Sequence, residues 1–141
     1  MYSFTIEGKP VAKQRPRFSR RGDRVCTFDP QKNEARLIRT SIMSGMTAAG
    51  LLRVLSGCIS VKMIFHTPIP SKCSQKRFKS LLSKPDKRRP DLDNYVKMYA
   101  DVMNGLIYND DSQITKLFCE KSYSDVPRVE ITVTDLEVNS E

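Results

Sequence analysis

The chain of 141 residues contains no long hydrophobic run, since its longest candidate, from Met46 to Ile59, is interrupted by Arg53. A membrane-spanning helix needs about 18 to 20 consecutive apolar residues, so we expect no contact with a membrane. The opening residues, MYSFTIEG, lack the cationic start and the long apolar core of a secretory signal. The sequence therefore predicts a cytoplasmic protein.

Metal-binding and nucleophilic side chains are scarce in their familiar patterns. His66 is the single histidine, and the four cysteines form no CxxC pair, which argues against a zinc site and against histidine-based nuclease chemistry. No GxSxG motif is present, and the alternating ligands and glycine of an EF-hand calcium loop are missing. The scattered cysteines are typical of free thiols in a reducing compartment.

Positive charge, in contrast, is abundant and concentrated in one part of the chain. Residues 1–90 hold 20 Lys and Arg against 5 Asp and Glu, a net charge of +15, whereas residues 91–141 hold 4 against 11, a net charge of −7. The whole chain carries +8. A solvated surface does not explain this segregation, so the composition favours an acidic partner such as a nucleic acid.

Residues 8–30 form the most basic segment. Two glycines and three prolines interrupt it, which predicts a long loop or a loose hairpin with short pairing. Its seven cations are interleaved with Phe18, an arrangement suited to phosphate contacts and base stacking, although a solvated hairpin tip is the alternative. Together with two later segments, it supplies the predicted DNA contacts, which are Lys13, Arg15, Arg17, Arg20, Arg21, Lys72, Lys76, Lys87, Arg88, Arg89 and Asn94.

Hydrophobic spacing predicts one domain over residues 1–141, of the α/β (α+β) class, with a mixed β-sheet packed against about three helices. Period-two alternation indicates strands at residues 2–7, 58–66, 113–123 and 128–134. Apolar residues at intervals of three and four indicate helices at residues 31–49, 71–82 and 93–105. We expect Met43 and Met46 to pack in the core, and Phe78, Leu81 and Leu82 to form the inner face of the second helix.

Two short acidic runs stand out beside the cations. Asp91 and Asp93 follow the basic run KRRP, and Asp93 is the predicted N-cap of the third helix. That helix is about 18 Å long at 1.5 Å per residue, and the extended chain after it can retrace this length at about 3.3 Å per residue. The second run, Asp110 and Asp111, can therefore return beside the first, although a polar turn is its simpler interpretation.

Three carboxylates at one point repel each other unless a cation neutralises them. Oxygen ligands of this kind suit Mg²⁺, with Mn²⁺ as a substitute, and phosphate oxygens complete its coordination shell. The predicted ligands are Asp91 and Asp93 together with Asp110 or Asp111. Such a metal can activate water and stabilise the leaving oxygen of a phosphodiester. Lys97, one turn after Asp93, can neutralise developing charge.

The run KRRPDLDNYVKMYADVMNGLIYNDDSQI, residues 87–114, resembles the RusA-type Holliday-junction resolvases, and the opening FTIEGKPVAKQRPRF resembles their Gram-positive and phage branch. The resemblance implies a small homodimeric endonuclease that cuts four-way DNA junctions symmetrically with Mg²⁺, in a prophage setting. The family's essential acidic residues fall on Asp91, Asp93 and Asp111 and its lysine on Lys97, so these are the expected catalytic residues. Pro90 interrupts the family's arginine run, and variable spacing leaves open which of Asp110 and Asp111 is the main ligand.

Two other functions fit the residues less fully. A non-catalytic basic DNA-binding module would use the aspartates only as caps and turn residues. A nuclease for other branched DNA or for RNA would keep the chemistry and change the substrate. If the substrate is a four-way junction, its two-fold symmetry requires two active sites related by the same axis, which predicts a homodimer.

Overall fold

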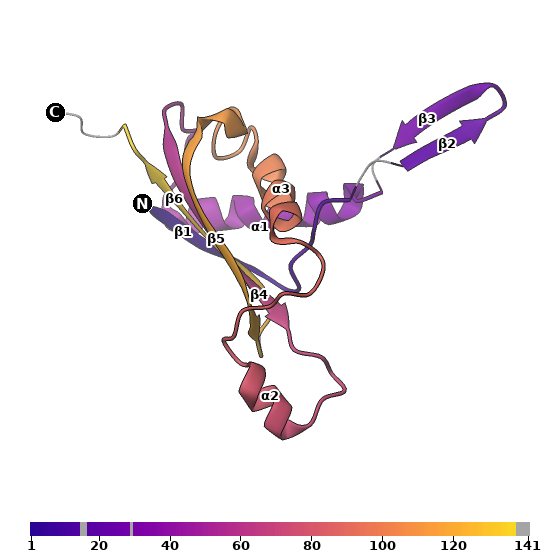
Figure 1. Cartoon of the computed structure of the whole chain (residues 1–141). Helices are drawn as coiled ribbons and strands as arrows, with labels where there is room; N and C mark the ends of the chain where they lie inside the picture. Colours follow the sequence, from indigo (N-terminus) through magenta and orange to yellow (C-terminus); the bar gives the residue numbers. More distant parts are fainter. Residues whose placement is uncertain (15–16, 29, 138–141) are drawn as a thin grey trace.

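Four strands form a mixed sheet at the centre of the protein (Figure 1). The order across the sheet is β1 (Tyr2–Glu7), β6 (Arg128–Asp135), β4 (Ile59–Pro68) and β5 (Ile114–Ser124). Neighbouring strands are antiparallel except β4 and β5, which are parallel. Parallel neighbours need a long crossover, and residues 69–113 supply it. This crossover contains both acidic runs of the sequence.

The computed structural model describes residues 1–14, 17–28 and 30–137, and for residues 17–21 and 25–28 it describes the backbone alone. Within these ranges the chain is a single compact α+β domain with three α-helices and no helix long and apolar enough to cross a membrane. The predicted fold class and all four predicted strands are confirmed, with ends that differ by one or two residues.

Two helices, α1 (Lys32–Ala49) and α3 (Leu92–Met103), cover one face of the sheet (Figure 1). Every second residue of the central strands points toward them, so that β4 is buried at alternate positions along its length. The ring of Phe65 stacks on Tyr95 with centroids 5.2 Å apart and lies 5.6 Å from the ring of Tyr99. The core therefore fixes α3 firmly against the sheet.

Helix α1 ends as expected at Gly50, whose left-handed φ of 81° suits a residue without a side chain. The expected burial of its methionines is only half right. Met46 is partly buried against the core, whereas the Met43 side chain is 51% exposed. Spacing alone placed both near the apolar face, but the sheet covers a narrower stripe of α1.

The short helix α2 (Gln75–Leu81) stands away from the sheet at the end of what we call the α2 lobe, residues 69–85 (Figure 1). Its first turn is capped by the Ser74 hydroxyl, which accepts a hydrogen bond from the Arg77 amide at 3.2 Å. The expected inner face is only partly formed, because Leu81 and Leu82 are half-buried, Phe78 is 36% exposed and no residue of α2 is fully buried. The amphipathic spacing is present, but it does not bury any residue of α2 fully.

A basic β-hairpin also projects from the domain. Strands β2 (Arg17–Arg21) and β3 (Arg24–Phe28) pair antiparallel, and Gly22 has a positive φ of 61° at the turn between them. Figure 1 shows this hairpin extending away from the sheet. The prediction of a hairpin with short pairing is confirmed.

Candidate functional site

The first acidic run lies where α3 begins. Asp91, not Asp93, is the N-cap, so the expected cap position is wrong by two residues. The backbone carbonyl of Asp91 accepts hydrogen bonds from the amides of Asn94 at 3.1 Å and Tyr95 at 3.4 Å. Its side chain makes no capping hydrogen bond, and its carboxylate is exposed. Helix capping therefore accounts for the backbone of Asp91 and leaves its carboxylate available.

The second acidic run returns to α3 by a tightly bonded turn. The buried Tyr108 hydroxyl donates to the carbonyl oxygen of Ala100 at 2.6 Å, which holds the returning chain against the helix. Burial raises the pKa of Tyr108, so the hydroxyl keeps its proton. Further along, the Gln113 side chain donates to the carbonyl oxygens of Leu55 and Gly57, both at 2.9 Å. These contacts fix the segment that carries Asp110 and Asp111.

The two aspartates of this turn have different surroundings. The Asp110 carboxylate caps the 3-10 helix η1 (Asp111–Gln113) by accepting a hydrogen bond from the Ser112 amide at 3.1 Å. The hydrogen bonds from Ser112 lower the pKa of Asp110. Asp111 is exposed and lines a cleft. The Asp110 carboxylate thus takes part in the turn, whereas Asp111 faces the cleft, and the choice between them as metal ligand stays a prediction.

A cleft of about 670 Å³ between α3 and β5 brings together residues from the two acidic runs. Asp93 and Lys97 line it from the helix and Asp111 from the turn, together with apolar residues that include Val96 and Leu117. We call it the α3–β5 cleft. Asp91 is not among its lining residues. Within the described ranges, no three acidic, histidine or cysteine side chains are close enough together to hold a metal ion.

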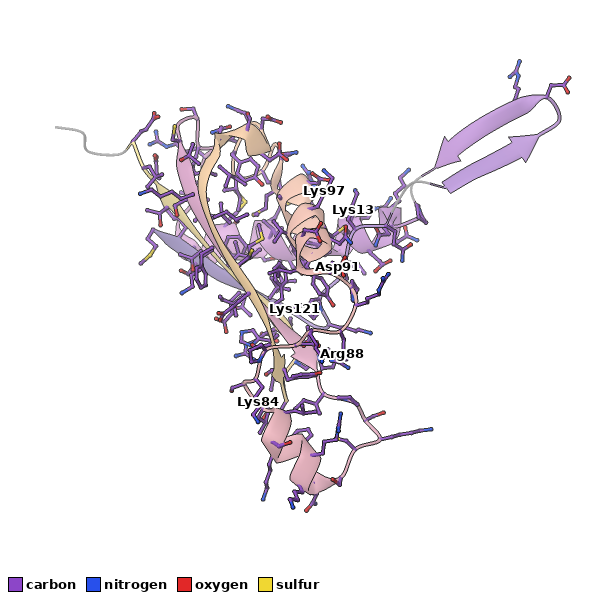
Figure 2. The ribbon with its side chains drawn as sticks, in the orientation of Figure 1. Lys13, Lys84, Arg88, Asp91, Lys97 and Lys121 are labelled. Atoms are coloured by element: carbon purple, nitrogen blue, oxygen red, sulfur yellow. The ribbon has the colours of Figure 1, made fainter. Side chains whose placement is uncertain are left out.

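Lys97 and Lys13 lie near each other (Figure 2), and both contact one acidic side chain. The Asp101 Oδ2 atom lies 3.5 Å from the Lys97 ammonium and 3.7 Å from that of Lys13. The Lys97 side chain is 62% exposed, so its ion pair with Asp101 is readily broken by a stronger anion. The Lys13 amide donates to the carbonyl oxygen of Asn94 at 2.9 Å. This bond ties the base of the basic hairpin to the first turn of α3.

Further hydrogen bonds hold the chain that leads to the hairpin. The Tyr99 hydroxyl accepts a hydrogen bond from the Val11 amide at 3.1 Å, and burial raises the pKa of Tyr99 to about 12. The buried Gln31 side chain donates to the Ala12 carbonyl oxygen at 2.6 Å and accepts from the Gln14 amide at 2.8 Å. Residues 11–14 are therefore fixed against α1 and α3.

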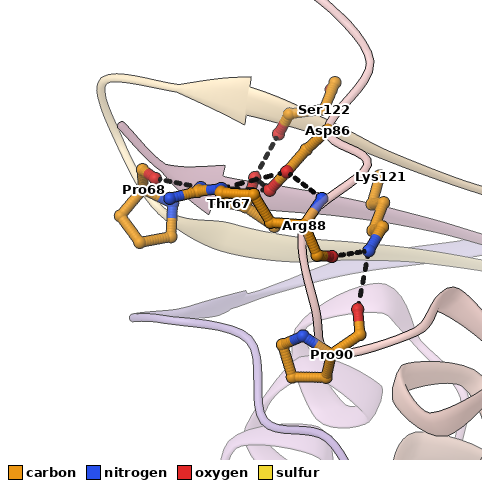
Figure 3. A network of polar contacts seen from close by, with 7 residues as sticks. All are labelled: Thr67, Pro68, Asp86, Arg88, Pro90, Lys121 and Ser122. Atoms are coloured by element: carbon orange, nitrogen blue, oxygen red, sulfur yellow. Dashed lines mark hydrogen bonds and ion pairs between the residues drawn. The ribbon is translucent and has the colours of Figure 1, made fainter. Parts of the chain in front are cut away.

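The segment before α3 is anchored by a buried carboxylate (Figure 3). Asp86 is only 6% exposed and accepts hydrogen bonds from the Thr67 hydroxyl at 2.7 Å and from the backbone and guanidinium of Arg88. Burial raises the pKa of Asp86, but the hydrogen bonds from Arg88 and Thr67 outweigh it and hold the pKa at about 2. The Arg88 guanidinium also donates to the carbonyl oxygen of Pro68 at 2.7 Å. Arg88, a predicted DNA contact, thus joins the two ends of the α2 lobe.

The structure describes the side chains of only some of the other predicted DNA contacts. Arg15 lies outside the described residues, and Arg17, Arg20 and Arg21 lie on β2, where only the backbone is described. The side chains that are described and exposed are Lys72, Lys76, Lys87, Arg89 and Asn94. Their exposure is compatible with contact to phosphate, and all of these assignments stay predictions.

Lys121 is a residue that sequence reasoning missed. It lies on β5, and its ammonium donates to the carbonyl oxygens of Arg88 and Pro90, at 2.6 Å for Pro90 (Figure 3). Its partners are backbone atoms some thirty residues away, so no motif or spacing in the sequence points to it. Only the position of β5 beside the loop reveals the contact.

The fold and the site define a basic α+β domain that places paired carboxylates among cations, the features of an enzyme acting on nucleic acid. The family model of endodeoxyribonuclease RusA matches residues 7–134, and the chain belongs to this family. It is also 35% identical over 139 residues to the uncharacterized protein YqaN of Bacillus subtilis (strain 168), a match that covers 94% of this chain and 95% of the relative. The resemblance drawn from the sequence is confirmed.

Proposed function

We propose that this protein is a Mg²⁺-dependent endonuclease that resolves four-way DNA junctions by paired symmetric nicks. Membership of the RusA family supports nuclease activity. The observation that carries the proposal is the α3–β5 cleft, which brings Asp93 and Lys97 of the helix together with Asp111 of the following turn. Polar turns and helix caps need no shared cleft, so a purely structural role leaves this convergence unexplained.

The residues at the cleft fit a hard divalent cation. Mg²⁺ is commonly held by one or two carboxylates, with water and substrate phosphate completing its shell. Asp93 and Asp111 would supply these carboxylates, and Asp91, exposed at the start of α3, is the nearest further ligand along the chain. When bound, the metal would supply activation of water and stabilisation of the leaving oxygen.

The chain's own cations would then act on the substrate. Lys97 lines the cleft and is largely exposed, so its ammonium can leave Asp101 and neutralise charge that develops on the phosphate. Lys13 is held beside it through the same aspartate.

Exposed cations on either side of the cleft would bind the DNA arms. The β2–β3 hairpin and the α2 lobe extend from different parts of the domain (Figure 1). A polyanion that spans both passes the start of α3 at Asp91, where Lys87 and Arg89 are exposed. Two copies of the chain, related by the two-fold axis of the junction, would place one cleft on each of two opposite strands.

The test uses a synthetic four-way junction, purified protein and either Mg²⁺ or EDTA. We expect paired nicks with ligatable ends in Mg²⁺ and none in EDTA. Asp93→Asn and Asp111→Asn should each abolish cutting while junction binding persists, because the carboxylates hold the metal and the cations hold the DNA. Asp110→Asn should retain most of the activity, since that carboxylate caps a turn.

The controls separate the competing functions. Flap, fork and single-stranded RNA substrates of equal length show whether cutting is specific to four-way DNA. Binding that weakens with salt, without metal-dependent cutting of any substrate, would identify a DNA-binding module. Cutting that survives the combined Asp93→Asn and Asp111→Asn changes would refute the assigned site.

A further inference from the structure

Lys121 holds the segment that leads into the first acidic run. An ammonium group has three N–H donors, and that of Lys121 gives two of them to backbone carbonyl oxygens, those of Arg88 and Pro90 (Figure 3). Such charge-assisted bonds are stronger than those between neutral groups. The ammonium also lies 5.9 Å from the ring centroid of Tyr95, within the range of a cation–π contact. The Lys121 side chain is thus held at its ammonium group, and its backbone is held in strand β5.

These bonds locate Asp91 from its N-terminal side. Pro90 immediately precedes Asp91, and the amides of the first turn of α3 bind the Asp91 carbonyl oxygen from the other side. The backbone of Asp91 is therefore held on both sides, while its carboxylate caps nothing. A carboxylate that is free but attached to a fixed backbone is preorganised for a ligand.

Strand β5 connects the two acidic runs through Lys121. The strand begins at Ile114, directly after the η1 turn that carries Asp111. Seven residues further along, the Lys121 side chain bonds the approach to Asp91, and its backbone carbonyl oxygen accepts from the Asp86 amide at 3.2 Å. One strand thus sets the position of Asp111 at its start and of the segment before Asp91 along its length.

We propose that Lys121 is a positioning residue that sets the place of the Asp91 carboxylate relative to Asp93 and Asp111, and so the affinity for the divalent ion. The inference rests on the proposed function, because it assigns Asp91 to the metal. Lys121 acts through backbone carbonyl groups and does not touch the substrate. Partners that orient a metal ligand from behind typically change metal affinity by about 10- to 100-fold.

The experiment compares Lys121→Met, an unbranched side chain that is one atom shorter and lacks the donors, with Lys121→Arg, which keeps both charge and donors. Mn²⁺ binding is measured on the DNA-free protein from the electron paramagnetic resonance signal of the free ion. We expect Lys121→Met to weaken Mn²⁺ binding by about 10-fold or more, and to lower kcat at a fixed Mg²⁺ concentration. The Kd for junction DNA in EDTA should not change, and Lys121→Arg should recover most of the loss. Lys116→Met, at an exposed lysine of the same strand, should behave as the unchanged protein.

Three results would overturn the proposal. They are unchanged Mn²⁺ affinity in Lys121→Met, equal losses in the Met and Arg variants, and a loss of junction binding without a loss of metal affinity, which would make Lys121 a phosphate contact. Lys121→Gln, which retains an amide donor, repeats the test if the Met variant does not fold. The unchanged protein could bind Mn²⁺, lose that binding in Asp91→Asn and still leave junctions uncut. This result would refute the proposed function and not the role of Lys121.

Discussion

Replacing Asp86 by asparagine tests whether the anchor beneath the α2 lobe depends on a buried charge. The pKa of Asp86 is about 2 in the folded protein, against an ordinary value of 3.8. A displacement of nearly two pH units corresponds to between about 2 and 3 kcal/mol of stability at neutral pH. The side chain is only 4% exposed, so solvent screens little of this interaction. We expect Asp86→Asn to lose this amount, because Arg88 then lacks its carboxylate.

The pH dependence follows from the direction of the pKa shift. A carboxyl group whose pKa is lowered by folding stabilises the protein fully above its unfolded pKa, and loses that contribution as the pH falls toward the folded pKa. The difference between the unchanged protein and Asp86→Asn should therefore be constant from about pH 7 to pH 5, and roughly half as large at pH 3. Near neutral pH it should lower Tm by about 6 to 12 °C.

Urea denaturation of both proteins at pH 7, 5 and 3 measures this difference directly. Asp23→Asn, at the exposed turn of the hairpin, removes one carboxylate without removing an anchor and is the matched control. A difference below about 0.5 kcal/mol at pH 7, the range of ordinary surface substitutions, would refute the reasoning. So would a difference that is the same size at pH 3 as at pH 7.

Three further outcomes can be stated. Gly45→Ala should destabilise the protein by about 1 to 3 kcal/mol in urea denaturation, because the added Cβ would lie 2.6 Å from the Cβ of Phe4. Tyr108→Phe should cost about 1 kcal/mol, the usual net value of one buried hydrogen bond, measured in the same way. Neutralising three exposed lysines of the α2 lobe to glutamine should weaken junction binding and reduce the slope of log K against log salt by about 2 to 3 in fluorescence anisotropy titrations, without changing Tm; they are Lys72, Lys76 and Lys79.

The strands and long helices could be predicted from the sequence because the spacing of their apolar residues reflects the one face that packs against the core. Burial of β4 at alternate positions is the pattern that its sequence alternation predicts. The same reasoning failed for Phe78, since amphipathic spacing shows that a helix has an apolar side without showing that another element covers it. Met43 failed for a related reason, because the width of the covered stripe depends on the sheet.

For the candidate site, sequence reasoning identified the residue types and their return in space, and it missed how they are held. Asp91, Asp93 and Asp111 were predicted to meet at one ion, with Lys97 beside them. Asp93, Lys97 and Asp111 line one cleft, whereas Asp91 is not among its lining residues. The role of Asp110 as a cap depends on a single amide of the η1 turn, which spacing does not specify. Lys121 could not be predicted at all, because backbone carbonyl groups carry no sequence signal.

The α2 lobe has a consequence for how this enzyme can change over evolutionary time. No residue of its helix is buried, and its two ends are joined by Arg88 and Asp86 beneath it. Substitutions in residues 71–80 therefore alter neither the packing of the core nor the closure of the crossover. If the α2 lobe binds DNA as proposed, mutations there can change which nucleic-acid shapes the domain binds without altering the proposed catalytic cleft.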